Sequence, residues 1–476
     1  MHINRNMSAV ITNKQLLRTE NKLAASMERL SSGFKINHAS DNPAGIAISN
    51  KMRAQIDALD QAESNASDAI SVVQIADGAL NEVSSILQRM RELSVQAANG
   101  TNSYNDRQNL QAEIDELQKE VQRISSDTEY NTKTLLDGSS DLRVYAEKAS
   151  RFYLSESVDA KTYAINVESM ATYATVEIPY EAPGADGMVF INGVSADITA
   201  DMTKEEYLHA VRVAAEEAGC FVEMDEAETT LKVKSDNYGY EEEIAFAVTK
   251  ELAEATGFAN RTDAIYSTNS EAYELNTTGQ DALVTFPTDK EVSGFTSTTT
   301  VNAEGNRIII SDRDGFSIDF LLSDEYVPEA VDTTNGNYEI EVTDIGSLTI
   351  QIGSNEHQTM DVRISEISAE SLYIDTIDVT VKNGAEKALE TLDDAIAKLS
   401  ETRSRLGAFQ NRLDSATVSL SATEENVTAA YSNLMDTDMA EEMAEYTQQN
   451  ILDQAAVSVL AQANELPQQV LSLLQR

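Results

Sequence analysis

The stretch LDQAAVSVLAQANELPQQVLSL, residues 452–473, decides the fold of this chain. Its apolar residues recur at alternating intervals of four and three, at Leu452, Ala456, Val459, Ala463, Leu466, Val470 and Leu473. This spacing places one apolar stripe along an α-helix and is typical of a coiled-coil seam. Because such a stripe needs a partner, the chain is predicted to end in a helix that packs against another helix.

A second apolar register precedes this seam but does not continue into it. It runs through Ala385, Leu389, Leu392, Ile396, Leu399, Leu406, Leu413, Leu420, Val427 and Leu434. If that register continued, Asp438, Glu441, Glu445 and Gln448 would lie on the seam. The helix is therefore predicted to break between Met435 and Glu442, and we expect a domain boundary there.

The N-terminal end has the same character. Leu16, Leu23 and Leu30 repeat every seven residues, with Met27 between them. Ser31-Ser32-Gly33 then predicts the end of this helix, since glycine after a polar turn is a common helix stop.

Two further helices are predicted downstream. Asp41-Asn42-Pro43 has the residues of a cap and a first helical turn. The apolar pattern that follows runs from Met52 to Ala97 and ends at Asn99-Gly100, and a shorter one runs from Leu110 to Ile124. Long helices of this kind cannot bury their apolar stripes alone, so they need each other or a neighbouring molecule.

The net charge of −45 is concentrated in the middle of the chain. Residues 141–350 hold 13 basic and 41 acidic residues, whereas residues 1–50 hold 6 and 3, and residues 437–476 hold 1 and 6. An acidic middle argues against nucleic-acid binding and favours a solvated, self-repelling surface. The oppositely charged ends attract each other weakly.

The chain has a single cysteine, Cys220, and no tryptophan. A disulfide framework is therefore excluded, and an exported chain would depend on packing alone. The N-terminus has no apolar core of signal-peptide length, so we expect export without a cleaved signal. No apolar run of membrane-spanning length is present, and no membrane partner is expected.

The middle region predicts two modules. Residues 188–194 alternate around Asn192-Gly193, which predicts a β-hairpin. A helix over 203–218, ended by Gly219, and strand-like segments near 221–248 complete an α+β module. Residues 262–350 are predicted to be all-β.

No enzymatic chemistry is predicted. The four histidines, at positions 2, 38, 209 and 357, lack the spacing of a zinc site on a helix. Cys220 has the features of a buried small hydrophobe. Asp312–Gly315 lacks the remaining ligands of a calcium loop and is predicted to be a β-turn. We expect no catalytic residue, metal or cofactor.

Several stretches at the two ends form a recognisable set. At the N-terminal end they are Glu28–Gly33, Lys35–Asn37, Ala44–Ile48 and Gln88–Thr101. At the C-terminal end they are Gln351–Glu356, Ser371-Leu372, Arg403–Ala408, Gln410–Leu413, Ser458–Asn464, Pro467-Gln468 and Leu471–Leu474. In sequence and order, this set resembles the bacterial flagellins over about half of the chain.

The resemblance implies a multi-domain fold, with a long α-helical coiled-coil rod formed by both termini and inserted α+β and all-β outer domains. The expected parts are an inner helical domain (1–42 and 437–476), a helical rod with a β-hairpin (43–175 and 380–436), a variable α+β domain (176–261) and a variable β-rich domain with a return segment (262–379).

The resemblance also implies a structural subunit that polymerises into the extracellular flagellar filament used for motility. The expected self-assembly seam consists of Leu16, Leu23, Met27, Leu30, Leu452, Ala456, Val459, Ala463, Leu466, Val470 and Leu473. The implied partners are further copies of the chain, an export chaperone at the C-terminal helix, and hook-associated and cap proteins.

A further implied partner is Toll-like receptor 5 of animal hosts. The residues that match the family's receptor motif are Arg89, Leu93 and Glu113. Arg89 and Leu93 are four residues apart on one helix and share a face. In the simpler interpretation, Arg89 and Glu113 only solvate the rod and Leu93 belongs to its apolar seam.

Two positions depart from the family pattern. His357 stands where many flagellins have glycine, and the turn Ser432–Asp438 lacks the arginine that commonly precedes it. Three other functions fit parts of the sequence: an intramolecular coiled-coil adaptor, a hook–filament junction protein, and an enzyme carried in the variable domains of a flagellin. The missing metal motif argues against the last of these.

Overall fold

The computed structural model describes residues 6–155, 157–225, 230–267, 270–287, 293–328, 336–381 and 383–474, with side chains up to residue 465 in the last helix. The chain divides into two compact units. The first comprises Met1–Ala69, Ile350–Met360 and Arg412–Arg476, and the second comprises Ile70–Thr349 and Asp361–Asn411.

The described α-helices are α1 (Met7–Ser32), α2 (Pro43–Ala97), α3 (Tyr104–Asp127), α4 (Lys204–Glu217), α5 (Lys250–Ala255), α6 (Gly384–Met435) and α7 (Met439–Leu474). Gly33, with φ of 77°, ends α1 in the left-handed conformation that glycine adopts freely. The gap between α6 and α7 confirms the predicted break. None of the described helices combines the length and the apolar composition that crossing a membrane requires.

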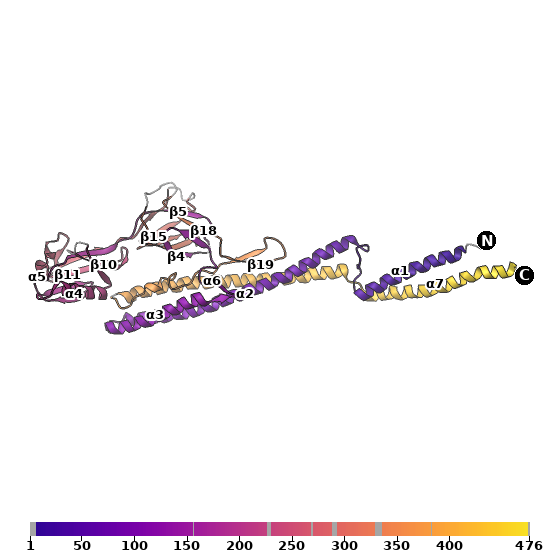
Figure 1. The fold of residues 1–476 in the computed structure, drawn as a ribbon, viewed down its shortest axis with the longest axis horizontal. Helices are drawn as coiled ribbons and strands as arrows, with labels where there is room; N and C mark the ends of the chain where they lie inside the picture. The colour runs from indigo at the N-terminus through magenta and orange to yellow at the C-terminus, as the bar shows by residue number, and fades with distance from the viewer. Residues whose placement is uncertain are drawn as a thin grey trace. The chain divides into compact units, whose positions relative to one another are not determined.

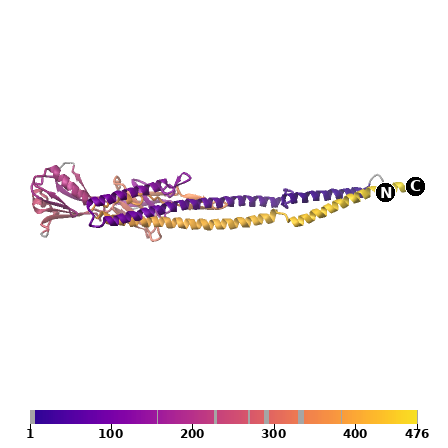
Figure 2. The same cartoon turned by 90° about the horizontal axis from the view of Figure 1, so that it is seen from below.

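In the first unit, α1 and α7 run antiparallel and side by side (Figures 1 and 2). At one end Asn6 Nδ2 donates to the Ala463 carbonyl (2.8 Å). At the other end the Lys35 backbone N–H donates to Met435 (2.7 Å) and that of Thr437 donates to Gly33 (2.9 Å). The two backbone hydrogen bonds join the segment that follows α1 to the segment that precedes α7.

The two departures from the flagellin pattern have local structural counterparts. Lys35 Nζ donates to the Asn433 carbonyl (2.7 Å), so a basic contact reaches the Ser432–Asp438 turn from the N-terminal segment instead. His357 has φ of 63°, which is a left-handed conformation that favours glycine.

In the second unit, the predicted apolar pattern of the rod is buried. Val73, Leu80, Val83, Leu87 and Met90 of α2 are each at most 1 % exposed. Ile114 and Val121 of α3 and Leu392, Leu399 and Leu406 of α6 are equally buried. A short hairpin of β1 (Glu129–Tyr130) and β2 (Lys133–Thr134) follows α3, as the family resemblance implied.

An α+β module occupies residues 173–278. Its strands are β6 (Tyr173–Pro179), β7 (Gly187–Ile191), β8 (Val194–Ile198), β9 (Cys220–Met224), β10 (Thr230–Tyr238), β11 (Glu243–Thr249), β12 (Ile265–Ser267) and β13 (Ala272–Thr278). They form sheets of order β6-β10-β9 and β12-β13-β11-β7-β8. Asn192 and Gly193 both have positive φ, as the tight turn of the predicted β7–β8 hairpin requires.

A β-rich module forms two further sheets, of order β14-β5-β18-β3 and β15-β16-β17-β4. Its strands are β3 (Arg143–Ala146), β4 (Ala149–Leu154), β5 (Thr162–Ser169), β14 (Leu283–Thr285), β15 (Thr300–Glu304), β16 (Arg307–Ser311), β17 (Ser317–Leu322) and β18 (Tyr338–Thr343). The remaining described elements are the hairpin β19 (Leu348–Gln351)–β20 (Thr359–Val362) and the 3-10 turns η1 (Phe258–Asn260) and η2 (Ile374–Thr376).

These pairings correct two of the predicted boundaries. Residues 143–169 were expected in the rod, but β3, β4 and β5 pair with β17 and β18 of the β-rich module. Residues 265–278 were expected in the β-rich domain, but β13 pairs with β11 of the α+β module. In both cases the pairing partner of a strand determines the module to which the strand belongs. A local pattern of residues does not identify that partner.

The α+β module is joined to the β-rich module through closely packed backbone. Thr172 and Gln280 exchange backbone hydrogen bonds of 2.8 and 3.2 Å. A side chain at Gly279 would place its Cβ 2.3 Å from the Gly239 carbonyl, so only glycine fits there. Asp281 Oδ1 accepts from the backbone N–H groups of Tyr240 (2.9 Å) and Gly305 (3.0 Å). The module's two ends therefore lie together at Thr172 and Gln280.

Candidate assembly and receptor surfaces

Most of the deeply buried side chains between α1 and α7 are polar. Thr19 and Ser26 of α1, and Glu442 and Gln449 of α7, are between 2 % and 7 % exposed. Ser26 Oγ donates to Glu442 Oε1 (2.5 Å), and an Arg29 nitrogen lies 3.6 Å from Glu442 Oε2. Residues of each pair are seven apart, so a heptad search for polar residues could have found this contact face.

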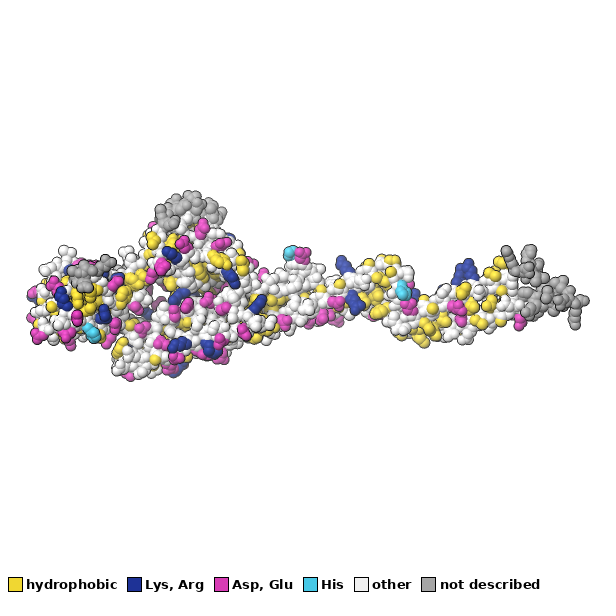
Figure 3. Space-filling model, viewed as in Figure 1, with side chains coloured by type: hydrophobic (Ala, Val, Ile, Leu, Met, Phe, Trp, Pro, Cys, Tyr) yellow, Lys and Arg dark blue, Asp and Glu magenta, His cyan; other side chains and the backbone are white. Residues whose placement is uncertain are grey.

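Large apolar side chains of the same two helices point outward. Those between 45 % and 64 % exposed are Met7, Val10, Ile11, Leu17, Met27, Met439, Met443, Ile451, Leu452, Val457 and Val459. Figure 3 shows hydrophobic side chains gathered on the visible face of this helix pair. An exposed apolar surface of this extent is typical of an interaction site.

The predicted seam therefore divides between two faces. Leu16, Leu23, Leu30 and Ala456 are half-buried and Ala463 is buried. Met27, Leu452 and Val459 are exposed, and the side chains of Leu466, Val470 and Leu473 lie outside the described residues. The stripe of α7 that contacts α1 instead contains Glu442, Tyr446, Gln449, Asp453, Ala456, Leu460 and Ala463. Apolar spacing finds an apolar stripe, but it does not tell which partner covers that stripe.

The structure brings two of the three predicted receptor residues together. Arg89 of α2 donates to Glu113 Oε1 of α3 through Nη2 (2.8 Å) and Nε (3.1 Å), and also to Glu92 (3.1 Å). The Arg89 and Glu113 side chains are about half exposed. Leu93 is only 1 % exposed, which agrees with the simpler interpretation of it as a seam residue.

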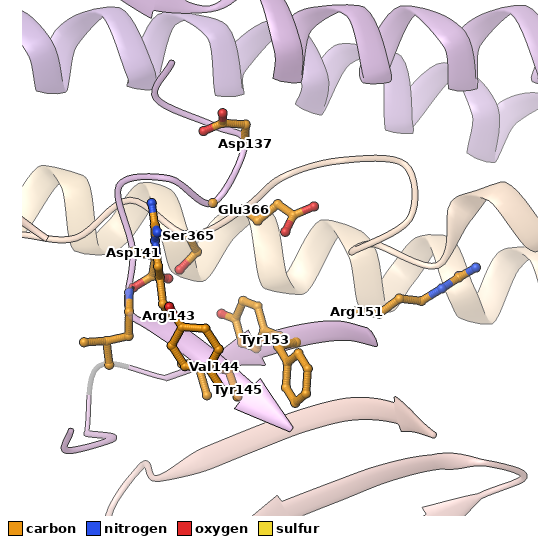
Figure 4. A pocket seen from close by; sticks show the side chains of 13 residues that line it. Asp137, Asp141, Arg143, Val144, Tyr145, Arg151, Tyr153, Ser365 and Glu366 are labelled. Atoms are coloured by element: carbon orange, nitrogen blue, oxygen red, sulfur yellow. The ribbon is translucent and has the colours of Figure 1, made fainter. Parts of the chain in front are cut away.

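A cavity of about 350 Å³ lies where residues 137–145 meet 151–154 and 365–366 (Figure 4). Arg151 on its wall is paired with Asp375 (2.8 Å), and Ser365 Oγ accepts from Arg405 (2.7 Å). Burial raises the pKa of Glu366 despite its hydrogen bond from Ser368. Within the described ranges, no three potential metal ligands lie together.

Cys220 is buried, as predicted. Burial, with the nearby charges of Glu242 and Asp236, raises the pKa of its thiol to about 12. The thiol is therefore protonated at neutral pH and unreactive, because the thiolate is the nucleophile.

Two family models match the ends of the chain. The bacterial flagellin N-terminal helical region matches residues 3–141, and the bacterial flagellin C-terminal helical region matches residues 389–474. The N-terminal match contains α1, the predicted seam residues of α1 and the three residues of the receptor motif. The C-terminal match contains α7 and its predicted seam residues.

Curated relatives match along the whole chain. A flagellin of Clostridium tyrobutyricum is 32 % identical over 471 residues, covering 98 % of this chain and 100 % of the relative. Polar flagellin A of Vibrio parahaemolyticus is 31 % identical over 474 residues, covering 100 % and 99 %. A flagellin of Salmonella rubislaw is 30 % identical over 524 residues, covering 99 % of both chains.

Solved structures match less closely. FliC from Burkholderia pseudomallei is 19 % identical with a TM-score of 0.24, covering 72 % of this chain and 99 % of that one. Flagellar hook associated protein-3 from Legionella pneumophila is 13 % identical with a TM-score of 0.30, covering 81 % and 98 %.

Proposed function

The chain belongs to the bacterial flagellin family, and on that premise we propose that α1 and α7 form the contacts through which its copies polymerise. As a flagellin it is a structural subunit of the extracellular flagellar filament and not an enzyme. One observation supports the role of α1 and α7: most of their deeply buried side chains are polar, while many of their large apolar side chains are exposed.

Neighbouring copies would cover this apolar surface. Each Leu or Val that becomes fully buried contributes roughly 1.5–3 kcal/mol. The face between α1 and α7 fully buries few apolar side chains in a single chain, so we expect these helices to order fully only on assembly. Before assembly, an export chaperone would cover the exposed face of α7. In the assembled filament, hook-associated and cap proteins would cover the apolar surface of the subunits at the two ends.

Replacing Val459 with aspartate tests the assembly surface. Val459 is 51 % exposed on α7, so the substitution spares the contact with α1. A carboxylate buried without a partner between subunits costs several kcal/mol, so we expect Val459→Asp to abolish filaments in negative-stain microscopy. The matched control is Val327→Asp, at a valine of the β-rich module that is 76 % exposed. Normal filaments from Val459→Asp would show that this face stays in solvent.

We propose that the acidic outer modules cover the filament surface and make no essential assembly contact. Figure 3 shows acidic side chains spread over the visible face of these modules. Their charge would repel copies in a closely packed filament core.

Joining Thr172 directly to Gln280 tests this placement, because the deleted segment 173–279 contains the whole core of the α+β module. The hydrogen bonds between Thr172 and Gln280 bring the two new ends together. We expect the shortened chain to keep its helical circular dichroism and to polymerise normally. A folded deletion variant without filaments would place the module in the assembly contact.

A second proposed function, recognition by Toll-like receptor 5, is favoured by the half-exposed pair of Arg89 and Glu113. The two side chains present a basic and an acidic group on neighbouring helices, while Leu93 supports the surface from within. Exposed charges of this kind set the specificity of an encounter more than its affinity.

Charge reversal separates a receptor contact from a structural ion pair. We expect Arg89→Glu to lower receptor activation in a reporter-cell assay by about tenfold at a fixed protein concentration. The double variant Arg89→Glu/Glu113→Arg restores the ion pair within the chain but reverses what a receptor meets. Its activation should stay low, and full recovery would assign the pair a structural role only.

A further inference from the structure

Asparagine is followed directly by glycine at several places in the chain. The pairs are Asn99-Gly100, Asn192-Gly193, Asn335-Gly336 and Asn383-Gly384. Because glycine has no Cβ, its backbone nitrogen can closely approach the side-chain amide of the asparagine before it. Asparagine is one of the chemically labile residues of proteins. The structure holds these pairs with different firmness, and that difference determines which of them can react.

The pair Asn99-Gly100 is exposed in the loop between α2 and α3. A Cβ added at Gly100 would meet no atom within 4 Å, so the surroundings leave room for movement. Within the described ranges, neither the Gly100 N–H nor Asn99 Nδ2 has a hydrogen-bond partner. Asn99 Oδ1 accepts from the Thr101 backbone N–H (3.2 Å). This hydrogen bond draws electrons away from the amide carbon of Asn99 and makes that carbon easier to attack.

We propose that Asn99 is a site of spontaneous deamidation. The Gly100 backbone nitrogen attacks Cγ of Asn99 and gives up its proton, the Cγ–Nδ2 bond breaks, and ammonia leaves with that proton. The product is a cyclic succinimide. Water then opens either C–N bond of the ring, which yields aspartate or isoaspartate at position 99. The hydrogen bond from Thr101 favours the first step, because the negative charge of the tetrahedral intermediate develops on Oδ1.

Asn192 precedes glycine too, but it is fixed in the hairpin of β7 and β8. Its Oδ1 accepts from the Ala245 N–H (2.8 Å), and its Nδ2 donates to the Ala218 carbonyl (3.3 Å). Its backbone N–H donates to the Ala245 carbonyl (2.9 Å). The side chain must leave both of its partners before it can turn toward the Gly193 nitrogen. Ring closure at Asn192 should therefore be slow.

The pair Asn383-Gly384 is protected in another way, at the start of α6. Gly384 is buried, and its N–H donates to the Val381 carbonyl (3.2 Å). A Cβ added at Gly384 would overlap the Asp378 carbonyl, so the attacking nitrogen is both hydrogen-bonded and closely surrounded. Asn335 lies outside the described residues and is not compared.

Deamidation of Asn99 would change the end of α2. Negative charge at a helix C-terminus is unfavourable, and the last turn of α2 has no basic residue to offset it. Isoaspartate also lengthens the main chain between the N–H and the carbonyl of residue 99. That N–H donates to the Gln96 carbonyl (3.2 Å), and that carbonyl accepts from the Asn102 N–H (3.0 Å). We therefore expect modified chains to unfold at a lower temperature.

Peptide mass spectrometry of the full chain, incubated at neutral pH, measures conversion at each pair separately. In the folded chain we expect conversion at Asn99 to be faster than at Asn192 and Asn383 by about tenfold or more, because hydrogen bonds must first open at those two sites. In urea, where the fold is lost, the three rates should converge. Equal rates in the folded chain, or a difference that persists in urea, would overturn the proposal.

Gly100→Ala tests the attacking atom. Alanine has room at this position, so the variant should fold as the parent does. Its methyl group hinders the approach of the backbone nitrogen, and we expect conversion at Asn99 to fall by about tenfold while conversion at Asn192 stays as it was. Unchanged conversion at Asn99 would overturn the role of the Gly100 nitrogen.

Asn99→Asp carries one product of the reaction from the start. Its thermal unfolding, followed by circular dichroism, should shift to lower temperature, as that of the parent chain should after long incubation. Asn99→Gln is the matched control, because the longer side chain keeps the amide but does not close the same ring. An unfolding temperature of Asn99→Asp equal to that of Asn99→Gln would contradict the predicted effect on α2.

Discussion

A chain that lacks residues 1–42 and 437–476 is expected to remain folded and to form no filaments. The truncation removes α1 and α7, which make their contacts with each other at Ser26–Glu442 and Asn6–Ala463. The apolar positions of α2, α3 and α6 that are buried in the second unit stay covered, because Leu80, Ile114 and Leu399 belong to that unit itself. The truncated chain should therefore lose assembly completely but lose little of its folded structure.

Sedimentation and negative-stain microscopy measure the first expectation, and circular dichroism with thermal unfolding measures the second. The full chain, treated with the same polymerising salt, is the control. Filaments from the truncated chain would contradict the assignment of assembly to the terminal helices. An unfolded truncated chain would instead show that α1 and α7 stabilise the rest of the protein.

The helix ends were predictable because their signals are local. Gly33 and Pro43 impose backbone conformations that a single residue determines, and the structure places helix ends at both. The register change near Met435 was equally visible, since acidic residues would have interrupted the apolar stripe. For the same reason Asn192-Gly193 identified its hairpin turn.

The arrangement of the terminal helices was not predictable from apolar spacing. Leu452 and Val459 fit a seam as well as Ala456 and Ala463 do, but only the latter pair faces α1. Burial against a neighbouring copy and burial within one chain select the same residue types. The strands of residues 143–169 were missed for a related reason, because their partners lie more than a hundred residues further along the chain.

Replacing Asp319 with alanine should destabilise the second unit by about 3–5 kcal/mol, the usual cost of removing one partner of a buried ion pair. Asp319 of β17 is 3 % exposed. Its carboxylate accepts from Arg307 of β16 (2.7 and 3.1 Å) and from Lys398 of α6 (2.7 Å). Both cations also lie against the ring of Tyr373, at 4.6 and 5.1 Å. The carboxylate thus joins the β-rich module to the rod, and its loss leaves two partly buried cations without their nearest anion.

The effect of this substitution should depend on pH. Burial by itself raises the pKa of Asp319, but the hydrogen bond from Arg307 and the charges of Lys398 and Arg307 outweigh it, so the pKa lies below its ordinary value of 3.8. A lowered carboxyl pKa stabilises the folded state fully above the unfolded value, and this contribution is lost as the pH falls through the folded value. The difference between the parent chain and Asp319→Ala should be constant near neutral pH and shrink below about pH 3.8.

Urea unfolding followed by circular dichroism at pH 7 and at pH 3 measures both expectations. The matched control is Asp393→Ala, which removes an aspartate of α6 from its ion pair with Arg91 (2.6 Å). Because that pair is exposed to solvent, which weakens its attraction, its loss should have a much smaller effect than the loss of Asp319. Equal effects of the two substitutions would mean that the carboxylate of Asp319 is hydrated rather than enclosed. The contact between β17 and α6 would then depend on its apolar neighbours, and the outer modules would be held to the rod without this ion cluster.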